Sequence, residues 1–450
     1  MDDQAAEALP LLPASGGSGR EGEGEGDDFG SHSEDLDYEK VPMIRLRIIY
    51  LMSCFAFSIY SPFFVLYMKN DIGLSAGQVG LVAALQIVGG YAVAPLISLL
   101  VDQFRIHKQV WITSMLLCTV PVELTPILCK SFRAAIVLSL CIACLNAPIS
   151  SLMDSSTLCF LGPKSHEYGK IRFFGAVGWG LGSLVAGSLV QVFGYQAAFH
   201  LFGFCMVLVS SIALSMDFTV IHEGGEDNVE DSSLSFFQSI TLLIPSWSYV
   251  FFLCVSVVSG FGATSLQSLL LMFLSDLGAS DFLEGLTLSV ATLSELPIFW
   301  ASGAIIKKYG ASSLLCASMI AFTARAVLVS FLHNPWMVLP LQLLHGFTFA
   351  GAWTAGVALA KENSPVGLET SGQSIFSFAY YGIGGLLGSV VGGQLYDLLG
   401  PREMYRIKGL VFAVTVLLYL LTLVDYSRLR RGSRRKDKES APRNSAYHRI

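Results

Sequence analysis

Apolar residues dominate the chain in long runs, each about as long as a helix that crosses a membrane. Such a helix needs about 20 predominantly apolar residues. Twelve runs separated by short polar breaks meet this length. The pattern therefore predicts twelve membrane-spanning helices over residues 44–68, 78–100, 110–129, 134–160, 170–194, 197–217, 245–270, 283–305, 312–333, 336–360, 372–396 and 406–425.

The longest polar break between spans, DFTVIHEGGEDNVEDSSLSF, divides them into two sets of six. We therefore expect a six-helix bundle over 44–217, a linker over 218–244 and a second six-helix bundle over 245–426. An internal repeat supports this division, because LGSLVAGSLVQVFGYQAAF in the fifth span aligns without gaps with LGSVVGGQLYDLLGPREMY in the eleventh. Two six-span halves related as parallel repeats are the plan of a large class of secondary transporters.

The two ends of the chain differ from the spans and from each other. Residues 1–43 are rich in Gly, Ser, Asp and Glu, which predicts a disordered acidic tail. Residues 427–450 form a basic tail directly after the last span. Lys and Arg also gather in alternate breaks, in the segments RIHK, KSHEYGKIR and KK. Because positive loops stay in the cytoplasm, we expect both termini there.

Composition excludes several classes of protein. The chain has 450 residues, of which 53% are hydrophobic and 14% charged, against about 25% charged in a soluble domain. Its nine cysteines show no metal-binding or disulfide spacing, so we expect no metal and no cofactor. No nucleophile and base are paired in the sequence, which argues against an enzyme. A basic tail beside a span sets topology, so nucleic-acid binding is not expected.

Ionisable residues inside the spans are the candidate functional residues, because charge at membrane depth is costly. Asp154 lies near the end of the fourth span and Arg172 near the start of the fifth, at similar heights. They are predicted either to form a structural ion pair or to belong to a substrate site or inner gate. Glu295, Arg325 and His345 lie mid-span in three successive helices.

The second group of charges suggests proton coupling. A glutamate whose arginine partner moves away can gain and lose a proton, and histidine titrates near neutral pH. Transporter sites lie near the bilayer middle, where Glu295, Arg325 and His345 are expected. The alternative for His345 alone is a packing role. Glu123, near the end of the third span, is more typical of the interface.

The motifs resemble one branch of the major facilitator superfamily. NAPISSLMDSS followed by EYGKIRFFGAVGWG is similar to its signature PLxD…YGxxRxxGSxG, and SELPIFW, QLLHGFTFAG and YYGIGGLLGSVVGGQLYDLLGPR agree in the second half. The branch, MFS_1-like, contains bacterial nucleoside–proton symporters, lactose-permease-like sugar symporters and animal major facilitator superfamily domain-containing 6-like proteins. The resemblance implies an all-α membrane protein with the major facilitator fold, twelve transmembrane helices in two six-helix halves.

The resemblance also implies roles for the charged residues. In sugar symporters of this kind, a span-four acid and a span-five arginine contact the sugar, and Asp154 and Arg172 match those positions. The acid, arginine and histidine of spans eight to ten join sugar recognition to proton coupling, which Glu295, Arg325 and His345 resemble. One departure is Thr348, which stands where those symporters carry a second acid. Candidate cavity aromatics are Trp179, Trp353, Tyr380 and Tyr381, for each of which helix packing is the favoured alternative.

The sequence thus predicts a secondary active transporter that moves a small polar solute, with sugars or nucleosides first, by alternating access and with proton coupling. The competing hypothesis is a transporter-shaped receptor or accessory protein without transport. The expected partners are the solute, protons and membrane lipid.

Two short motifs in the first tail have the form of sorting signals. EALPLL, with Glu7, Leu11 and Leu12, has the acidic-dileucine form that sorting adaptors read, and YEKV has the tyrosine-based form. A sorting adaptor is therefore a further expected partner. We favour a lysosomal or vacuolar membrane over the plasma membrane.

Overall fold

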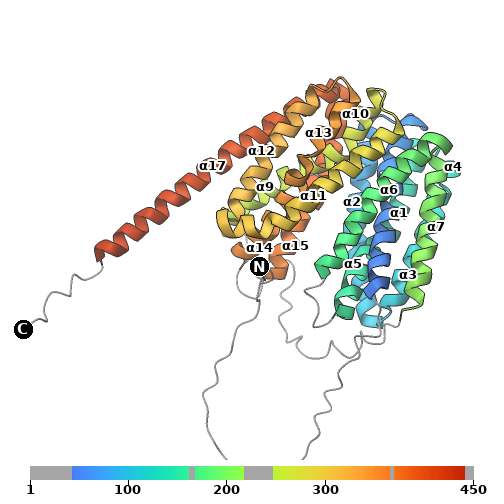
Figure 1. The fold of residues 1–450 in the computed structure, drawn as a ribbon, viewed down its shortest axis with the longest axis horizontal. Helices are drawn as coiled ribbons and strands as arrows, with labels where there is room; N and C mark the ends of the chain where they lie inside the picture. The colour runs from blue at the N-terminus through green and yellow to red at the C-terminus, as the bar shows by residue number, and fades with distance from the viewer. Residues whose placement is uncertain (1–42, 162–167, 217–246, 365–368, 441–450) are drawn as a thin grey trace, which may run out of the picture. The chain divides into compact units, whose positions relative to one another are not determined.

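The computed structural model describes residues 43–161, 168–216, 247–364 and 369–440. The first 42 residues, with Glu7, Leu11 and Leu12, and the whole predicted 218–244 linker lie outside these ranges, as does the C-terminal segment 441–450. The described residues from 43 onward belong to one compact unit. Helices are the regular structure of the described part, and Figure 1 shows them running from blue to red.

The helices of the first set match the first six predicted spans, with a one-turn α4 that follows the third. Their bounds are α1 (Met43–Asn70), α2 (Ala76–Phe104), α3 (His107–Glu123), α4 (Thr125–Leu128), α5 (Phe132–Leu161), α6 (Tyr168–Phe193) and α7 (Tyr195–Leu214).

The second set is more broken, because π-helical turns interrupt three of its spans. Its elements are α9 (Trp247–Thr264), η4 (Ser265–Leu269), α10 (Leu270–Asp276), α11 (Asp281–Tyr309), α12 (Ala311–Ser330), η5 (Pro335–Met337), α13 (Val338–Gln342), η6 (Phe347–Gly351), α14 (Ala352–Asn363), α15 (Glu369–Ser377), η7 (Phe378–Gly384), α16 (Gly385–Leu399) and α17 (Pro401–Ser440).

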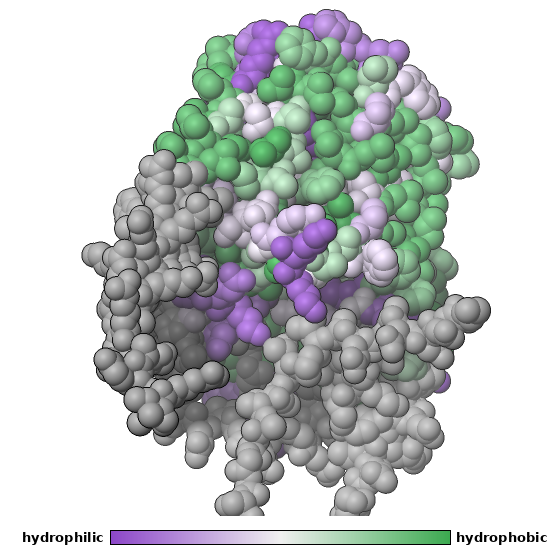
Figure 2. All heavy atoms as spheres, turned by 60° about the vertical axis from the view of Figure 1, so that its left-hand side comes forward, coloured by the Kyte–Doolittle hydropathy of each residue, from purple (hydrophilic) through white to green (hydrophobic). Residues whose placement is uncertain are grey.

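The described helices account for the predicted spans. Eleven are long and apolar enough to cross a membrane, and the remaining one, the tenth predicted span, is a pair of helical segments, Pro335–Gln342 and Phe347–Asn363, bent by 44°. Much of the described surface on the face drawn in Figure 2 is apolar (green), and the described helices expose large side chains such as Trp300 (90%) and Leu398 (76%). Water would make such exposure unfavourable, whereas lipid does not. The fold is therefore that of an all-α membrane protein.

One helix extends well beyond its predicted span. The apolar run ends near residue 425, but α17 continues to Ser440. Lys and Arg dominate this extension and are good helix formers, so the helix does not need apolar residues to continue. Hydropathy therefore predicts the membrane-spanning part of a helix but not the residue at which the helix ends.

Two close helix contacts join the two sets at one end of the molecule, which we call the tied face. It is the end where α1 and α16 finish and where α2 and α17 begin. A Cβ added to Gly187 of α6 would lie 2.4 Å from the backbone oxygen of Asp281, and one added to Gly393 of α16 would lie 2.5 Å from that of Ala76. Gly187 and Gly393 are equivalent in the internal repeat. The repeat therefore places a glycine at both contacts, α6 with α11 and α2 with α16.

Polar bonds reinforce the tied face. The Asp397 carboxylate of α16 accepts hydrogen bonds from the Ser75 hydroxyl (2.6 Å) and from the backbone N–H groups of Ala76 (2.9 Å) and Gly77 (2.8 Å). A carboxylate at a helix N-terminus satisfies free N–H groups and favours the helix dipole. Asp276 also binds Lys69 across this face. The two sets of helices are thus held together at the end where these bonds lie.

Candidate functional site

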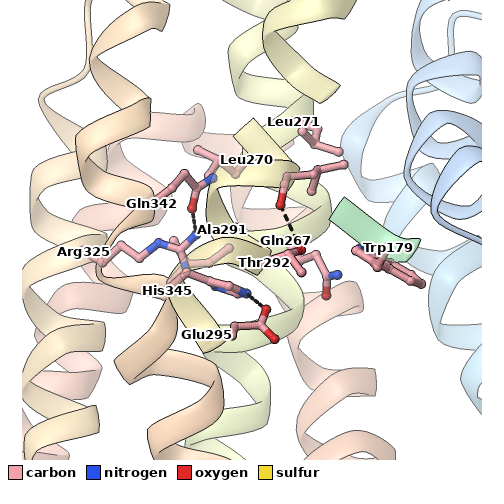
Figure 3. Close-up of a pocket in the computed structure, with 12 residues that line it drawn as sticks. Trp179, Gln267, Leu270, Leu271, Ala291, Thr292, Glu295, Arg325, Gln342 and His345 are labelled. Atoms are coloured by element: carbon pink, nitrogen blue, oxygen red, sulfur yellow. Dashed lines mark hydrogen bonds and ion pairs between the residues drawn. The ribbon is translucent and has the colours of Figure 1, made fainter. Parts of the chain in front are cut away.

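A small cavity lies at mid-length of the helices, where α6 of the first set faces the second set. Its volume is about 30 Å³, room for one or two water molecules. Figure 3 shows its polar side chains converging from several elements. Its lining residues are Trp179, Leu266, Gln267, Leu270, Leu271, Leu288, Ala291, Thr292, Glu295, Arg325, Gln342 and His345.

Arg325 lies at the centre of the polar side of the cavity. Its side chain comes from α12 and is only 2% exposed. Its Nη1 group donates to His345 Nδ1 (2.8 Å) and to the Thr348 hydroxyl (3.2 Å), and its Nη2 group donates to the Gln342 side-chain oxygen. These bonds place a positive charge at membrane depth against uncharged acceptors.

The bond from Arg325 fixes the proton on His345. A guanidinium is only a donor, so Nδ1 of His345 must accept and carries no proton. The ring proton is therefore assigned to Nε2, which lies 3.1 Å from Glu295 Oε1. His345 also stacks on the Phe349 ring, with centroids 5.8 Å apart. The three predicted coupling residues thus form one chain of contacts, Arg325 to His345 to Glu295.

A break in the tenth span brings His345 to Glu295. Between α13 and η6 the backbone leaves the regular helix, which frees groups that need partners. Ser294 of α11 lies at the break: its hydroxyl accepts from the Gly346 N–H (2.9 Å), and its single proton is shared between the carbonyls of Ala291 (2.6 Å) and Gln342 (3.1 Å). A Cβ on Gly346 would lie 2.1 Å from the Ser294 oxygen, so only glycine allows this approach.

Trp179 is the lining residue that comes from the first set of helices. The Ser289 hydroxyl of α11 donates to the carbonyl of Gly180 (2.7 Å), the residue after Trp179. This bond holds α6 against α11 beside the cavity. Figure 3 shows Trp179 facing the cavity from the side opposite Arg325. Both sets of helices therefore contribute to the wall.

Asp154 and Arg172 form a second cluster and do not line this cavity. Asp154 Oδ2 lies 3.7 Å from Arg172 Nη1, so the predicted pair does meet. The Tyr50 hydroxyl donates to Asp154 Oδ1 at 2.5 Å. Arg172 also lies over the Tyr168 ring, 5.9 Å from its centroid, and its side chain is 61% exposed. The arginine of this cluster is open to its surroundings, unlike Arg325.

Sequence reasoning missed the uncharged polar residues of both clusters. Gln342 binds Arg325, and Gln267 and Thr292 line the cavity. Their signal was a polar side chain within an apolar run, which is weaker than a charge. Of the four predicted aromatics, Trp179 lines the cavity, whereas Trp353, Tyr380 and Tyr381 pack against one another.

The remaining candidates have simpler surroundings. Glu123, the last residue of α3, pairs with His200 in the second turn of α7. In the part of the chain that the structure describes, no group of three His, Cys, Asp or Glu side chains could hold a metal ion.

Comparisons with known proteins agree with this fold. The model of the MFS_1 like family matches residues 43–407. The chain is 24% identical over 319 residues to major facilitator superfamily domain-containing protein 6-like protein A of Xenopus laevis, covering 67% of this chain and 51% of that protein. The chain therefore spans about half the length of that relative. It is 22% identical over 375 residues to the maltose permease of Geobacillus stearothermophilus, covering 83% of this chain and 93% of the permease.

A solved structure shows the same fold. A crystal structure of a mutant of the nucleoside transporter NupG superposes with a TM-score of 0.74 at 14% identity, covering 84% of this chain and 98% of that one. Two of these proteins are by name a permease and a transporter, in line with the sequence prediction that the chain is not an enzyme. The family model covers far more than half of the residues, and the chain belongs to the MFS_1 like family of the major facilitator superfamily.

Proposed function

We propose that the protein is a secondary active transporter that moves a small polar solute, of the sugar or nucleoside class, together with protons. The observation that carries this proposal is the contact chain of Arg325, His345 and Glu295 in the wall of a cavity between two sets of helices. Ionisable groups at this depth are rarely kept without a function. A maltose permease and a nucleoside transporter among the similar proteins support the solute class.

Glu295 is the proton carrier in this proposal. Arg325 donates a hydrogen bond to Nδ1 of His345. The imidazole ring can therefore take up a second proton only if that bond breaks. A proton that reaches the pair is therefore taken by the Glu295 carboxylate. Protonation of Glu295 removes the negative charge that attracts the Nε2–H group of His345. The contacts among Glu295, His345 and Arg325 are then weaker. Proton binding is thus linked to the geometry of the cavity wall.

Access to the cavity alternates between the two faces. We infer that the bundles 44–217 and 245–426 rock against each other about the central cavity. With both termini in the cytoplasm, as the positive loops predict, the tied face is the outer one and the structure is inward-facing. Asp154 and Arg172 then lie toward the cytoplasmic side, where they contact the solute or close the inner gate.

Proteoliposome uptake with and without an inward proton gradient tests the transport proposal. The wild-type protein should accumulate a labelled sugar or nucleoside more strongly with the gradient. Glu295→Gln keeps the side-chain size but cannot bind a proton, so its uptake should lose most of its pH dependence. Glu403→Gln, at an exposed acid on α17 that pairs with Arg406 one turn away, is the matched control. Unchanged pH dependence in Glu295→Gln would contradict the role of this residue.

A reconstituted protein that transports no solute would point to a different function. No transport of any sugar, nucleoside or organic acid by the reconstituted protein would favour the transporter-shaped receptor or accessory protein instead.

We also propose that the protein resides in a lysosomal or vacuolar membrane. The basis is the acidic-dileucine motif of Glu7, Leu11 and Leu12 in the first tail, which a sorting adaptor would read from the cytoplasm.

A further inference from the structure

We propose that Arg325 forms a carboxylate subsite in the cavity, so that the transported solute is a small hydroxylated acid, such as a sugar acid, and not a neutral sugar. This inference rests on the proposed transport function and narrows its substrate class. It starts from the charge balance around Arg325.

Arg325 is a buried cation that faces no carboxylate of its own. Its bonding partners Gln342, His345 and Thr348 are all uncharged. Three titratable groups from the surrounding helices face Arg325. They are Glu295 of α11, Tyr405 of α17 and His345 at the break in the tenth span. Glu295 is bound to His345, and the Tyr405 hydroxyl donates to a backbone oxygen. Glu295 therefore balances the positive charge of Arg325 without contacting it.

One edge of the Arg325 guanidinium has donors to spare. Nη1 uses both of its protons, whereas Nη2 donates one proton and Nε has no acceptor among the described residues. In a planar guanidinium, Nε–H and one of the two Nη2–H groups lie on the same edge, and in Arg325 the Nε–H of this edge is unpaired among the described residues. A carboxylate accepts two parallel hydrogen bonds from such an edge, which is the preferred geometry of arginine with carboxylates. A neutral hydroxyl could use only one of them.

The surroundings fit an acid with a polar body. The cavity that reaches Arg325 has a volume of about 30 Å³, the space of two water-sized groups and thus of a carboxylate. Gln267 and Thr292 offer hydrogen bonds farther along its wall, and Trp179 offers an aromatic face. The rest of the solute would occupy this side once the helices part.

Protonation of Glu295 completes the charge balance. The carboxylate of Glu295 plus one proton gives a neutral acid, which leaves Arg325 as the one full charge of its contact cluster. An arriving carboxylate restores neutrality, whereas a neutral sugar would leave a buried cation without a counter-charge, which is costly. We therefore expect one proton to be transported with each carboxylate, so that no net charge crosses the membrane.

Binding to the full chain in lipid nanodiscs tests the subsite without requiring transport. The probes are two matched pairs, glucuronate with glucose and lactate with glycerol, at pH 5.5 and 7.5, with chloride added to equalise ionic strength. Tryptophan fluorescence and the melting temperature report binding. Each acid should bind about tenfold more tightly than its neutral partner, and more tightly at the lower pH. Equal responses of acid and neutral compound at both pH values would overturn the subsite.

A charge-filling variant tests the position of the subsite while keeping the fold. The Thr348 hydroxyl already lies 3.2 Å from Arg325 Nη1, so Thr348→Glu would place a carboxylate beside the guanidinium. This variant should remain folded, because it satisfies the buried charge, and should bind the acids about tenfold less tightly. Arg406→Gln, which removes an exposed arginine of α17, is the control and should bind like wild type. Full acid binding by Thr348→Glu would place the anion elsewhere and refute the proposal.

The outcomes separate this inference from the proposed function. Proton-driven uptake of glucose without acid binding would keep the transporter and refute the subsite. Acid binding that Thr348→Glu abolishes, with no flux of any solute, would keep the subsite and refute transport.

Discussion

Asp154 is held more closely by a hydroxyl than by its arginine. Its carboxylate lies 2.5 Å from the Tyr50 oxygen and 3.7 Å from the Arg172 guanidinium. A largely exposed ion pair contributes little to stability, whereas a hydrogen bond to a charged group contributes more. Tyr50 therefore fixes the position of Asp154 and leaves Arg172 able to turn toward another anion.

Tyr50→Phe should consequently destabilise the cluster more than the loss of Arg172. We expect a cost of about 1 kcal/mol and a fall of about 2 °C in melting temperature. Asp154→Ala, which removes the acceptor, should have a similar effect, and the double variant should be no worse than the more harmful single one, because both remove the same bond. Tyr309→Phe, at an exposed tyrosine, is the control. Strictly additive effects in thermal unfolding of the purified protein would show that the two side chains do not interact.

The charged residues were predictable from the sequence, whereas their uncharged partners were not. A charge within an apolar run is conspicuous, and this singled out Glu295, Arg325 and His345. Gln342 and Tyr50 acquire their importance only from the distances between helices, which hydropathy does not encode. The direction of the His345 proton likewise follows from one contact with Arg325.

At the scale of elements, the broken tenth span is the feature that the apolar run concealed. The run 336–360 predicts one straight helix, but the structure bends it by 44°. Ser294 satisfies the backbone groups at the break, so the cost of the bend is offset by the neighbouring helix. Local sequence cannot show this compensation, because Ser294 belongs to a different span, the eighth.

The contact of α6 with α11 yields a prediction at the same scale. Gly285 lies against the Ser183 backbone oxygen, 2.4 Å from where its Cβ would be. Gly285→Leu should force the two helices apart at the tied face and favour the conformation in which this face is open. Spin labels at Asp71 and Glu403, measured by pulsed electron resonance, should report a longer distance than in wild type.

Gly303→Leu is the control for this measurement. Gly303 is on the same helix, but a Cβ there would meet no heavy atom within 4 Å. The label distance should stay unchanged in this variant. An unchanged distance in Gly285→Leu as well would mean that α6 and α11 do not set the closure of the tied face.

For the whole molecule, the number and order of spans followed from length and hydropathy alone, because the bilayer imposes both. The family followed from motifs around Asp154 and Arg172. What the sequence could not predict is which face is closed, since Asp397 reaches Ser75 and the start of α2 from the far end of the chain.

The proposed lysosomal or vacuolar location rests on the dileucine motif of the first tail. Leu11 and Leu12 are the residues that an adaptor would bind, so the double variant Leu11→Ala, Leu12→Ala should redirect the protein to the plasma membrane. Fluorescence imaging of the tagged full chain checks this, with Leu9→Ala as the neighbouring control. Unchanged localisation of the double variant would show that this motif is not the sorting signal.

The repeated glycines also bear on how such a chain arises. Gly187 and Gly393 are equivalent positions, and each packs against the second or eighth span, which are themselves equivalent. A symmetric dimer of one six-helix chain would obtain both contacts from a single glycine, as an isologous interface does. The two contacts are not identical, because Asp397 in one stands at the repeat position of Gln191 in the other. Asp397 accepts from the Ala76 N–H and Gln191 accepts from the Phe282 N–H (3.3 Å), so a charged cap holds one side of the tied face and a neutral cap holds the other. A change at one of these positions can therefore alter one side of the tied face without altering the other.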